Sequence, residues 1–313
     1  MEATPARRAA FAFARQITVE PHRFTDAEFN ELRKHYKDLQ ILEMVLSTAG
    51  NNAINRWKEG AGIPQSSNGG AFGRREPGAP ETPRPAHSYV TPTSEKFKTV
   101  ISRVVPLQKN EKLEGTTAAC VFMREPLEPR AEVEKALEAA AKRTSRLPLV
   151  DEAKARELLA DDWSKDPLPQ WVRLLANFPR SGKSRILSQL SAETKGDLKP
   201  LLKAQVSWII ARQDRAWYAL GLAKQRLQKL GVSDDQIFKL DGDWSDFTPQ
   251  ERAMFRVAQR LAASPIVLTD AEVDKALKLT SPRDVVQLIN YVTVCASFDR
   301  ITEAAGLQLE GSR

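Results

Sequence analysis

The sequence has few of the residues that carry thiol and metal chemistry. Its 313 residues include 2 cysteines, Cys120 and Cys295, and 3 histidines, His22, His35 and His87. The cysteine and histidine spacings that gather four zinc ligands do not occur, and two cysteines cannot form a disulfide-rich scaffold. No apolar run approaches the roughly 18 to 20 residues of a membrane-spanning helix. We therefore expect no metal, no cofactor and no membrane association.

The charge is basic without being concentrated. Lys plus Arg number 47 against 40 for Asp plus Glu, a net charge of +7, and the two signs are interleaved along the chain. No run of five or six basic residues suggests a nucleic-acid-binding arm, so we expect solvated helix faces and no nucleic-acid partner. Near the start, a short Ala and Phe stretch is broken by Arg15 and lacks a cleavage site of small residues. That pattern makes a poor signal peptide and predicts a cytoplasmic protein.

The chain contains an internal repeat. The tetrapeptide at 25–28, Thr-Asp-Ala-Glu, returns at 269–272, an offset of 244 residues, and the match continues without a gap in both directions. Identical pairs include Phe11 and Phe255, Pro21 and Pro265, Arg56 and Arg300, Glu59 and Glu303, and Gly62 and Gly306. A gapless match over roughly fifty residues indicates a duplicated structural unit.

Both copies show a helical pattern. Thr25 offers a side-chain cap to the helix that follows it, and Glu28, three residues on, completes a capping box. Residues 41–54 carry apolar side chains three and four positions apart and lead to a Gly and Pro breaker at 60–64. Residues 285–301 do the same before a glycine, which predicts that Cys295 is a small thiol on the apolar face of a buried helix.

Composition divides the rest of the chain. Residues 65–95 are dense in Pro, Gly and Ser, which is typical of a flexible linker. Residues 96–165 form an insert, with a possible hairpin over 97–123 and helices over 128–144 and 152–159. Residues 166–313 are helical to the end, and residues 1–64 form a partial first repeat. The predicted fold class is all-α.

Two segments of the last domain bear on function. Residues 179–184 resemble the end of a phosphate-binding loop, but Asn177 stands where that motif has its first glycine, and no buried strand precedes it. We expect an ordinary loop between two helices. Residues 198–231 predict a pair of helices interrupted by the polar residues 212–215, where Asp214 offers a cap to the second helix.

This helix pair resembles the alkylhydroperoxidase AhpD/carboxymuconolactone decarboxylase-like family. The resemblance rests on 201–208, 215–223 and 230–237, and on two helix ends, 55–57 and 299–301. It covers 167–309 as one complete unit and 9–64 as the later part of another. It implies an AhpD-like all-helical fold that assembles into trimers or hexamers. Peroxidase members of the family use a Cys-x-x-Cys pair, a histidine four residues further on and an upstream glutamate.

The sequence departs from that family at each reactive position. In the register of the resemblance the cysteines fall on Ala216 and Ala219, the histidine on Ala223 (or on Leu222 if the helix shifts by one) and the glutamate near Ala204. Alanine can neither attack a peroxide nor resolve a sulfenic acid, and it cannot relay a proton. We therefore expect a small-molecule-binding or scaffold protein that has lost thiol peroxidase chemistry. The alternative is an active enzyme of the family, a lactone decarboxylase or a peroxidase-related one, that uses non-thiol residues.

Residues around these positions are candidates for a pocket. Aromatic walls and guanidinium groups suit a small apolar or carboxylate-bearing ligand. The candidates are Trp208, Arg212, Asp214, Arg215, Trp217 and Tyr218. For non-thiol chemistry, Asp214 and Tyr218 are the candidate acid or base, and His22, His35 and Glu43 of the first copy are a further possibility. Alternatively, the aromatic residues belong to the core and the arginines pair with Asp241, Asp243 or Asp246.

The first copy begins after the counterpart of the pocket helices. Its apolar residues Ile41, Leu42, Val45 and Ile54 would be unfavourable to expose. We expect this face to be buried against the second unit or against an oligomer partner, and we expect a homo-oligomer.

Overall fold

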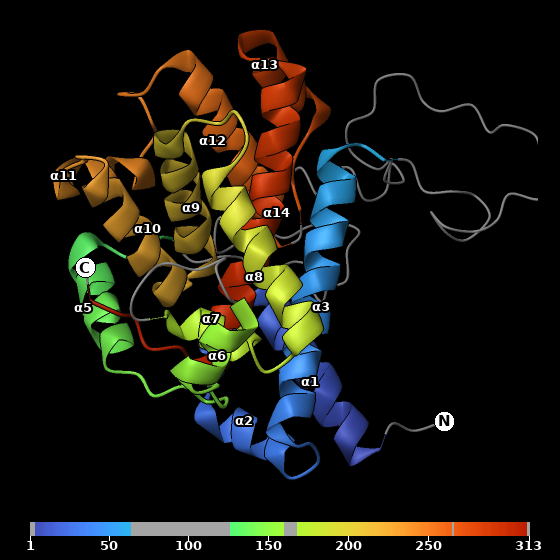
Figure 1. Cartoon of the computed structure of the whole chain (residues 1–313). Coiled ribbons are helices and arrows are strands. Elements are labelled where there is room, and N and C mark those ends of the chain that lie inside the picture. Colours follow the sequence, from blue (N-terminus) through green and yellow to red (C-terminus); the bar gives the residue numbers. More distant parts are fainter. Residues whose placement is uncertain (1–3, 64–125, 160–167, 265, 312–313) are drawn as a thin grey trace, which may run out of the picture.

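The described part of the chain is helical. The computed structural model describes residues 4–63, 126–159, 168–264 and 266–311 (Figure 1). The elements are α1 Pro5–Val19, η1 Pro21–Arg23, α2 Asp26–Arg33, α3 Asp38–Gly60, α5 Arg130–Ala141, α6 Glu152–Leu159, α7 Gln170–Leu175, α8 Pro179–Thr194, α9 Pro200–Asp214, α10 Trp217–Lys229, α11 Asp234–Phe238, η4 Lys239–Asp241, α12 Pro249–Ala262, α13 Asp270–Leu279 and α14 Pro282–Ala305. These residues contain no strand, which confirms the all-α class. The linker at 65–95 and the hairpin at 97–123 lie outside the described residues.

The repeat in sequence is also a repeat in structure. The helices α1, α2 and α3 of the first copy each begin 244 residues before α12, α13 and α14 of the second. The same capping box opens α2 and α13: the backbone N–H of Thr25 donates to Glu28 over 2.7 Å, and that of Thr269 donates to Glu272 over 3.0 Å. Side-chain caps satisfy N–H groups that the first helical turn leaves unpaired, so each copy sets its own helix starts.

Two equivalent arginines join the copies where α3 packs along α14 (Figure 1). Arg56 of α3 donates to the carbonyl of Ala262 at the end of α12, over 3.2 Å. Arg300 of α14 donates to the carbonyl of Thr18 near the end of α1, over 3.0 Å. Thr18 is the counterpart of Ala262, so each copy pairs carbonyls at the C-terminal end of the other copy's first helix. Both guanidinium groups also reach Ser264, at 2.7 and 3.2 Å, and the two copies meet as pseudo-symmetric partners.

The buried apolar residues form two clusters. One gathers side chains of α5 and of α9 to α14. The other joins the first copy to residues 147–159 and 168–186 and to the end of α14, so these segments cover part of the first copy. Ile41, Leu42 and Val45 are fully buried there, and the expected burial of this face is confirmed for them within the chain. Ile54 is 52% exposed within the chain, so its burial against an oligomer partner stays a prediction.

Two local predictions are wrong. Residues 179–184 are not a loop but the first turns of α8. A Cβ on Gly182 would lie 1.8 Å from the Leu175 carbonyl, so this glycine lets α8 approach α7 closely. Asp214 does not cap α10, because it is the last residue of α9 and the N-cap of α10 is Ala216, without a side-chain bond. Arg215 makes the turn between the two helices with a left-handed φ of 51°.

Candidate functional site

The four alanines that the sequence resemblance aligns with the family's reactive residues are buried. Ala204 lies on α9, Ala216 caps α10, and Ala219 and Ala223 follow on α10. None is more than 6% exposed, and all four belong to the cluster that joins α9, α10 and α14. The register of the resemblance therefore places these positions inside packed helices, where small side chains let α9 and α10 lie close together.

Trp208 and Arg212 share one acidic partner. The Trp208 indole N–H donates to Asp241 over 2.8 Å, and Arg212 Nε donates to the other oxygen of the same carboxylate over 2.8 Å. Trp208 and Arg212 are each at most 1% exposed. Burial raises the pKa of Asp241 even though Arg212 and Trp208 favour its charged form. The sequence analysis named Asp241, Asp243 and Asp246 as possible partners of the arginines. Of these, Asp241 forms an ion pair with Arg212.

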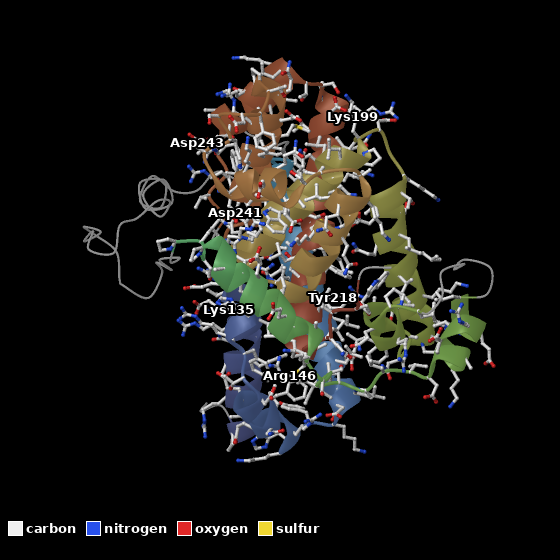
Figure 2. The ribbon with its side chains drawn as sticks, turned by 90° about the vertical axis from the view of Figure 1, so that its left-hand side faces the viewer. Lys135, Arg146, Lys199, Tyr218, Asp241 and Asp243 are labelled. Carbon is white, nitrogen blue, oxygen red and sulfur yellow. The ribbon has the colours of Figure 1, made fainter. Side chains whose placement is uncertain are left out.

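Glu128, which precedes α5, binds two arginines at the turn between α9 and α10. Its carboxylate accepts from Arg215 and, over 3.1 Å, from Arg212, while its carbonyl accepts from Arg212 over 2.7 Å. Burial by itself would raise the pKa of Glu128, but the two guanidinium groups outweigh burial and hold the pKa below its ordinary value. Glu128 lies just before α5, the helix that crosses α10 in Figure 2.

Asp214 and Tyr218 belong to a separate group of contacts. The Asp214 carboxylate accepts from Arg300 over 2.9 Å, with both side chains fully buried. The Tyr218 backbone N–H donates to Glu303 over 3.2 Å, and its hydroxyl donates to Glu310 over 3.1 Å. Burial, reinforced by Glu310, raises the pKa of Tyr218 well above its ordinary value. The structure therefore divides the candidate pocket residues between two sets of internal partners.

Trp217, the remaining candidate, is partly buried against the same cluster as Trp208. The histidines and Glu43 of the first copy add little to this region. His35 lies 3.9 Å from Glu31, and Glu43 is exposed.

Within the described residues, no group of three or more His, Cys, Asp and Glu side chains could hold a metal ion. None of the described helices has the length and apolar character needed to cross a membrane.

A polar cluster that the sequence did not reveal lies between α8, α9 and α14. The hydroxyls of Ser207 and Tyr291 are 2.7 Å apart, and the Tyr291 hydroxyl donates to Glu193 over 3.0 Å. Arg226 of α10 pairs with the same glutamate. Ser207 and Tyr291 are almost completely buried. The available signal was a hydroxyl side chain on each of two apolar helices, Ser207 and Tyr291. A local periodicity does not show contacts between residues more than 80 positions apart.

Cys295 borders this cluster without being activated by it. Its Sγ lies 3.7 Å from the Ser207 hydroxyl, and the side chain is buried, as predicted. Burial raises the pKa of the Cys295 thiol far above its ordinary value, and the charges of Glu193 and Asp299 add to the rise. The sulfur is therefore a neutral thiol at physiological pH, whereas nucleophilic attack requires the thiolate.

Asp299 is a second buried acid that the sequence analysis did not single out. It is 2% exposed, and its Oδ2 has no hydrogen-bond partner. Burial raises the pKa of Asp299 well above its ordinary value, and the nearby Asp214 carboxylate adds to the rise, while Arg300 opposes it. The counterpart of Asp299 in the first copy is Asn55, which is exposed.

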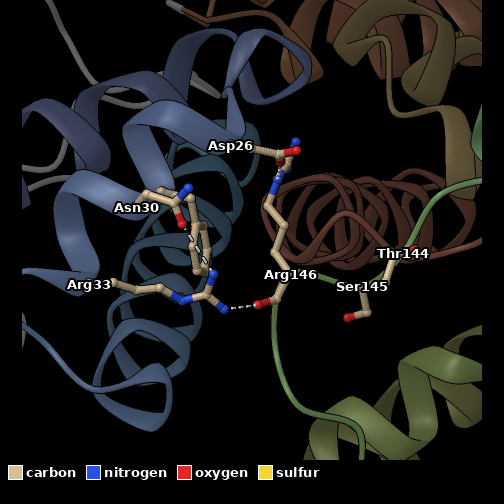
Figure 3. A pocket seen from close by; sticks show the side chains of 7 residues that line it. Asp26, Asn30, Arg33, Thr144, Ser145 and Arg146 are labelled. Carbon is tan, nitrogen blue, oxygen red and sulfur yellow. Dashed lines mark hydrogen bonds and ion pairs between the residues drawn. The ribbon is translucent and has the colours of Figure 1, made fainter.

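A cavity of about 240 Å³ opens where α2 meets the segment before α6 (Figure 3). Its charged side chains already have partners: Arg33 donates to Asp38 over 2.8 Å, and Arg146 donates to Asp26 over 2.6 Å. Arg33 also donates to the Arg146 carbonyl over 2.6 Å, as drawn in Figure 3. These contacts hold α2 of the first copy against the segment that follows α5. The cavity therefore lies at a packing interface between these two elements.

Comparisons with known proteins find one remote likeness. No protein-family model matches the sequence, and no curated protein matches it. Two solved structures share part of the fold: a cysteine-to-alanine variant of the debrominase Bmp8 in complex with 2,3,4-tribromopyrrole, and the same debrominase without ligand. Each has 14% sequence identity and a TM-score of 0.43, with 60% and 59% of this chain and 91% of the other chain covered. A likeness at this level assigns neither a family nor a function to this chain.

Proposed function

We propose that this chain is a helical binding or scaffold protein that keeps a frame resembling the AhpD/carboxymuconolactone decarboxylase-like family without its thiol peroxidase chemistry. The observation that carries the proposal is the burial of Ala216 and Ala219 in packed helices. Thiol peroxidase chemistry needs a thiolate and a resolving thiol at such a pair of positions. Among the described residues the thiol is Cys295, and burial keeps it protonated.

The contacts of the candidate pocket residues favour a stabilising role over a ligand site at the same place. A ligand carboxylate at Arg212 would have to displace Asp241 and Glu128, and one at Arg300 would have to displace Asp214. Breaking a buried pair leaves an uncompensated charge, which is strongly unfavourable. We infer that Arg212 and Arg215 hold α5 and the α9–α10 turn together. Assembly into a homo-oligomer and a cytoplasmic location remain parts of the proposal.

The test is a peroxide assay on the purified full-length chain. Hydroperoxide with a dithiol reductant is expected to be consumed no faster than with the heat-denatured protein. Cys295→Ser is expected to leave that background unchanged, because the thiol is buried and neutral. Cys120→Ser is the matched control for the other cysteine. Turnover well above background, abolished by either substitution, would overturn the proposal.

The Tyr291 cluster favours a second candidate, an enzyme that uses non-thiol residues. Tyr291 joins Ser207 to Glu193 by hydrogen bonds, an arrangement that can pass a proton between hydroxyl and carboxylate groups. Decarboxylation of lactone acids that is lost in Tyr291→Phe but kept in Tyr36→Phe would support this candidate. Tyr36 is suitable as the control because its hydroxyl binds a backbone carbonyl in the first copy instead.

A further inference from the structure

Arg185 of α8 is a half-buried cation without an acidic partner among the described residues. Its guanidinium lies against Gly50 of α3, with Nη atoms 3.7 and 3.9 Å from the place where a Cβ on Gly50 would stand. Its hydrogen bond to the described residues is long, 3.5 Å from Nη2 to the Leu46 carbonyl. Burial lowers the pKa of Arg185, and no neighbouring charge opposes that effect. A guanidinium carries five N–H donors, so most of them are left for another group.

The part of α3 beyond Gly50 exposes two large apolar side chains, Ile54 and Trp57. Ile54 and Trp57 follow Gly50 by four and seven residues, which places all three on one face of the helix. Ile54 is 52% exposed and Trp57 is 40% exposed. The Arg185 guanidinium therefore contacts α3 at Gly50, and the side chains of Ile54 and Trp57 continue from this contact along the same face of α3.

The second copy shows how the same face behaves when it is covered. Phe298 and Ile301 of α14 are the counterparts of Ile54 and Trp57. Ile301 is 6% exposed, and the Phe298 ring packs edge-on against Trp171 at 5.6 Å. These positions are apolar in both copies, but the described elements cover them only in the second.

We propose that Arg185, Gly50, Ile54 and Trp57 form a binding site for a small organic anion with a carboxylate head and an apolar body. Charge complementarity assigns the head to the Arg185 guanidinium, whose planar donors match a carboxylate with two parallel hydrogen bonds. The apolar body then lies along Ile54 and Trp57 and removes them from water. Gly50 leaves room beside the guanidinium, whereas its counterpart in the second copy is Val294.

This site is separate from the alanine positions on α9 and α10, so it stands whether or not thiol chemistry is absent. The head and the body make separate contributions: a neutral compound leaves the guanidinium unpaired, and a carboxylate without a body leaves the apolar face in water. The ligand class is therefore recognised by the combination of the two.

The first experiment titrates the full-length protein with octanoate, octan-1-ol and acetate by isothermal titration calorimetry. Octanoate is expected to bind at one site per chain with a dissociation constant below about 1 mM, and the other two at least about tenfold more weakly. No octanoate binding at millimolar concentration, or equal binding of octanoate and octan-1-ol, would overturn the proposal.

Variants then locate the site. Arg185→Gln is expected to weaken octanoate binding about tenfold or more, because it removes a charge-assisted pair. Arg180→Gln on the same helix makes the same charge change at an exposed position and is expected to bind like the wild type. Unchanged binding in Arg185→Gln, or an equal loss in both variants, would contradict the assignment.

A second variant keeps the charge and fills the space. Gly50→Val introduces the residue found at the equivalent position of the second copy, Val294. A Cβ at residue 50 would make only ordinary van der Waals contacts, so the variant is expected to fold. It is expected to weaken octanoate binding about tenfold while leaving the thermal unfolding temperature close to that of the wild type. Wild-type affinity in a folded Gly50→Val protein would place the ligand elsewhere.

Discussion

The two copies of the repeat share their helix starts but differ in what covers them. The C-terminal half of α14 is enclosed by α7 and α10, so Phe298 and Ile301 are shielded, while the same part of α3 exposes Ile54 and Trp57. Near the helix start the difference is reversed, because Leu42 is fully buried and its counterpart Val286 is 57% exposed. A repeated sequence thus reproduces its helices, while the segments packed around each copy decide which apolar residues become core.

The equivalent arginines of the two copies, Arg56 and Arg300, also differ in what surrounds them. Arg56 and Arg300 make equivalent hydrogen bonds to the other copy's first helix. Arg300 additionally pairs with the buried carboxylate of Asp214 on α9. In the second copy the arginine therefore combines a helix-end hydrogen bond with a buried ion pair.

Removing each arginine is the strongest test of this comparison. Arg300→Ala is expected to lower the free energy of unfolding by about 4 kcal/mol, because it removes the Arg300 guanidinium from its buried ion pair with Asp214. Arg56→Ala is expected to lower the free energy of unfolding by about 2 kcal/mol, since the hydrogen-bond partners of Arg56 include backbone carbonyls and the side chains of Asn52 and Ser264. Urea denaturation followed by circular dichroism measures both. Equal losses would show that the Asp214 pair adds nothing to the shared contacts.

Truncation of the equivalent apolar residues tests the difference in cover. Phe298→Ala is expected to lower the free energy of unfolding by about 3 kcal/mol, because it opens space beside Trp171 and Tyr218. Ile54→Ala is expected to change it by less than about 0.5 kcal/mol, as is usual for an exposed side chain. The same denaturation measurement applies. A large loss in Ile54→Ala would mean that this face is covered in solution.

The pair Asp299 and Asn55 gives a pH-dependent version of the test. Burial raises the pKa of Asp299 in the folded protein, so its contribution to stability is greatest below the ordinary aspartate pKa of about 4 and is lost as the pH rises through the folded value. Asp299→Asn removes this loss and is expected to be more stable than the wild type at pH 8, with the difference in the free energy of unfolding closing toward pH 4.

The control for that variant is Asn55→Asp, which places the acid at the exposed equivalent position. Its stability difference from the wild type is expected to stay nearly constant over the same pH range. Denaturation curves at pH 4, 6 and 8 measure both variants. A pH-independent gain in Asp299→Asn would show that Asp299 is ionised with an ordinary pKa.

The capping boxes are expected to show the smallest effect and the closest agreement between copies. Thr25→Ala and Thr269→Ala should each lower the free energy of unfolding by about 1 kcal/mol, because each removes the hydroxyl that accepts a backbone N–H of the first helical turn and donates to the capping-box glutamate. Losses that differ by more than about 1 kcal/mol would show that tertiary packing alters even this local interaction.

Much of the secondary structure could be predicted from local patterns. The capping box at Thr25 and the helix over residues 285–301 are observed as expected, and the repeated tetrapeptide forms the same capping box at Thr269. The prediction for Asp214 failed because a cap is a local preference, while the observed partner, Arg300, is 86 residues away. The prediction for residues 179–184 failed because proline and glycine also suit the first turns of a helix that packs tightly on its neighbour.

The amino-acid sequence by itself determined the repeat, the helix starts and the absence of cysteines at residues 216 and 219, since these depend on composition and on spacings of three or four residues. Only the tertiary structure decided that Asp241 meets Trp208 and Arg212, that Asp299 is buried without a partner for one oxygen, and that Arg185 lies beside Gly50. Those outcomes depend on how separate helices pack. The burial and charge pairing of a side chain are properties of its neighbours in space, which no local pattern encodes.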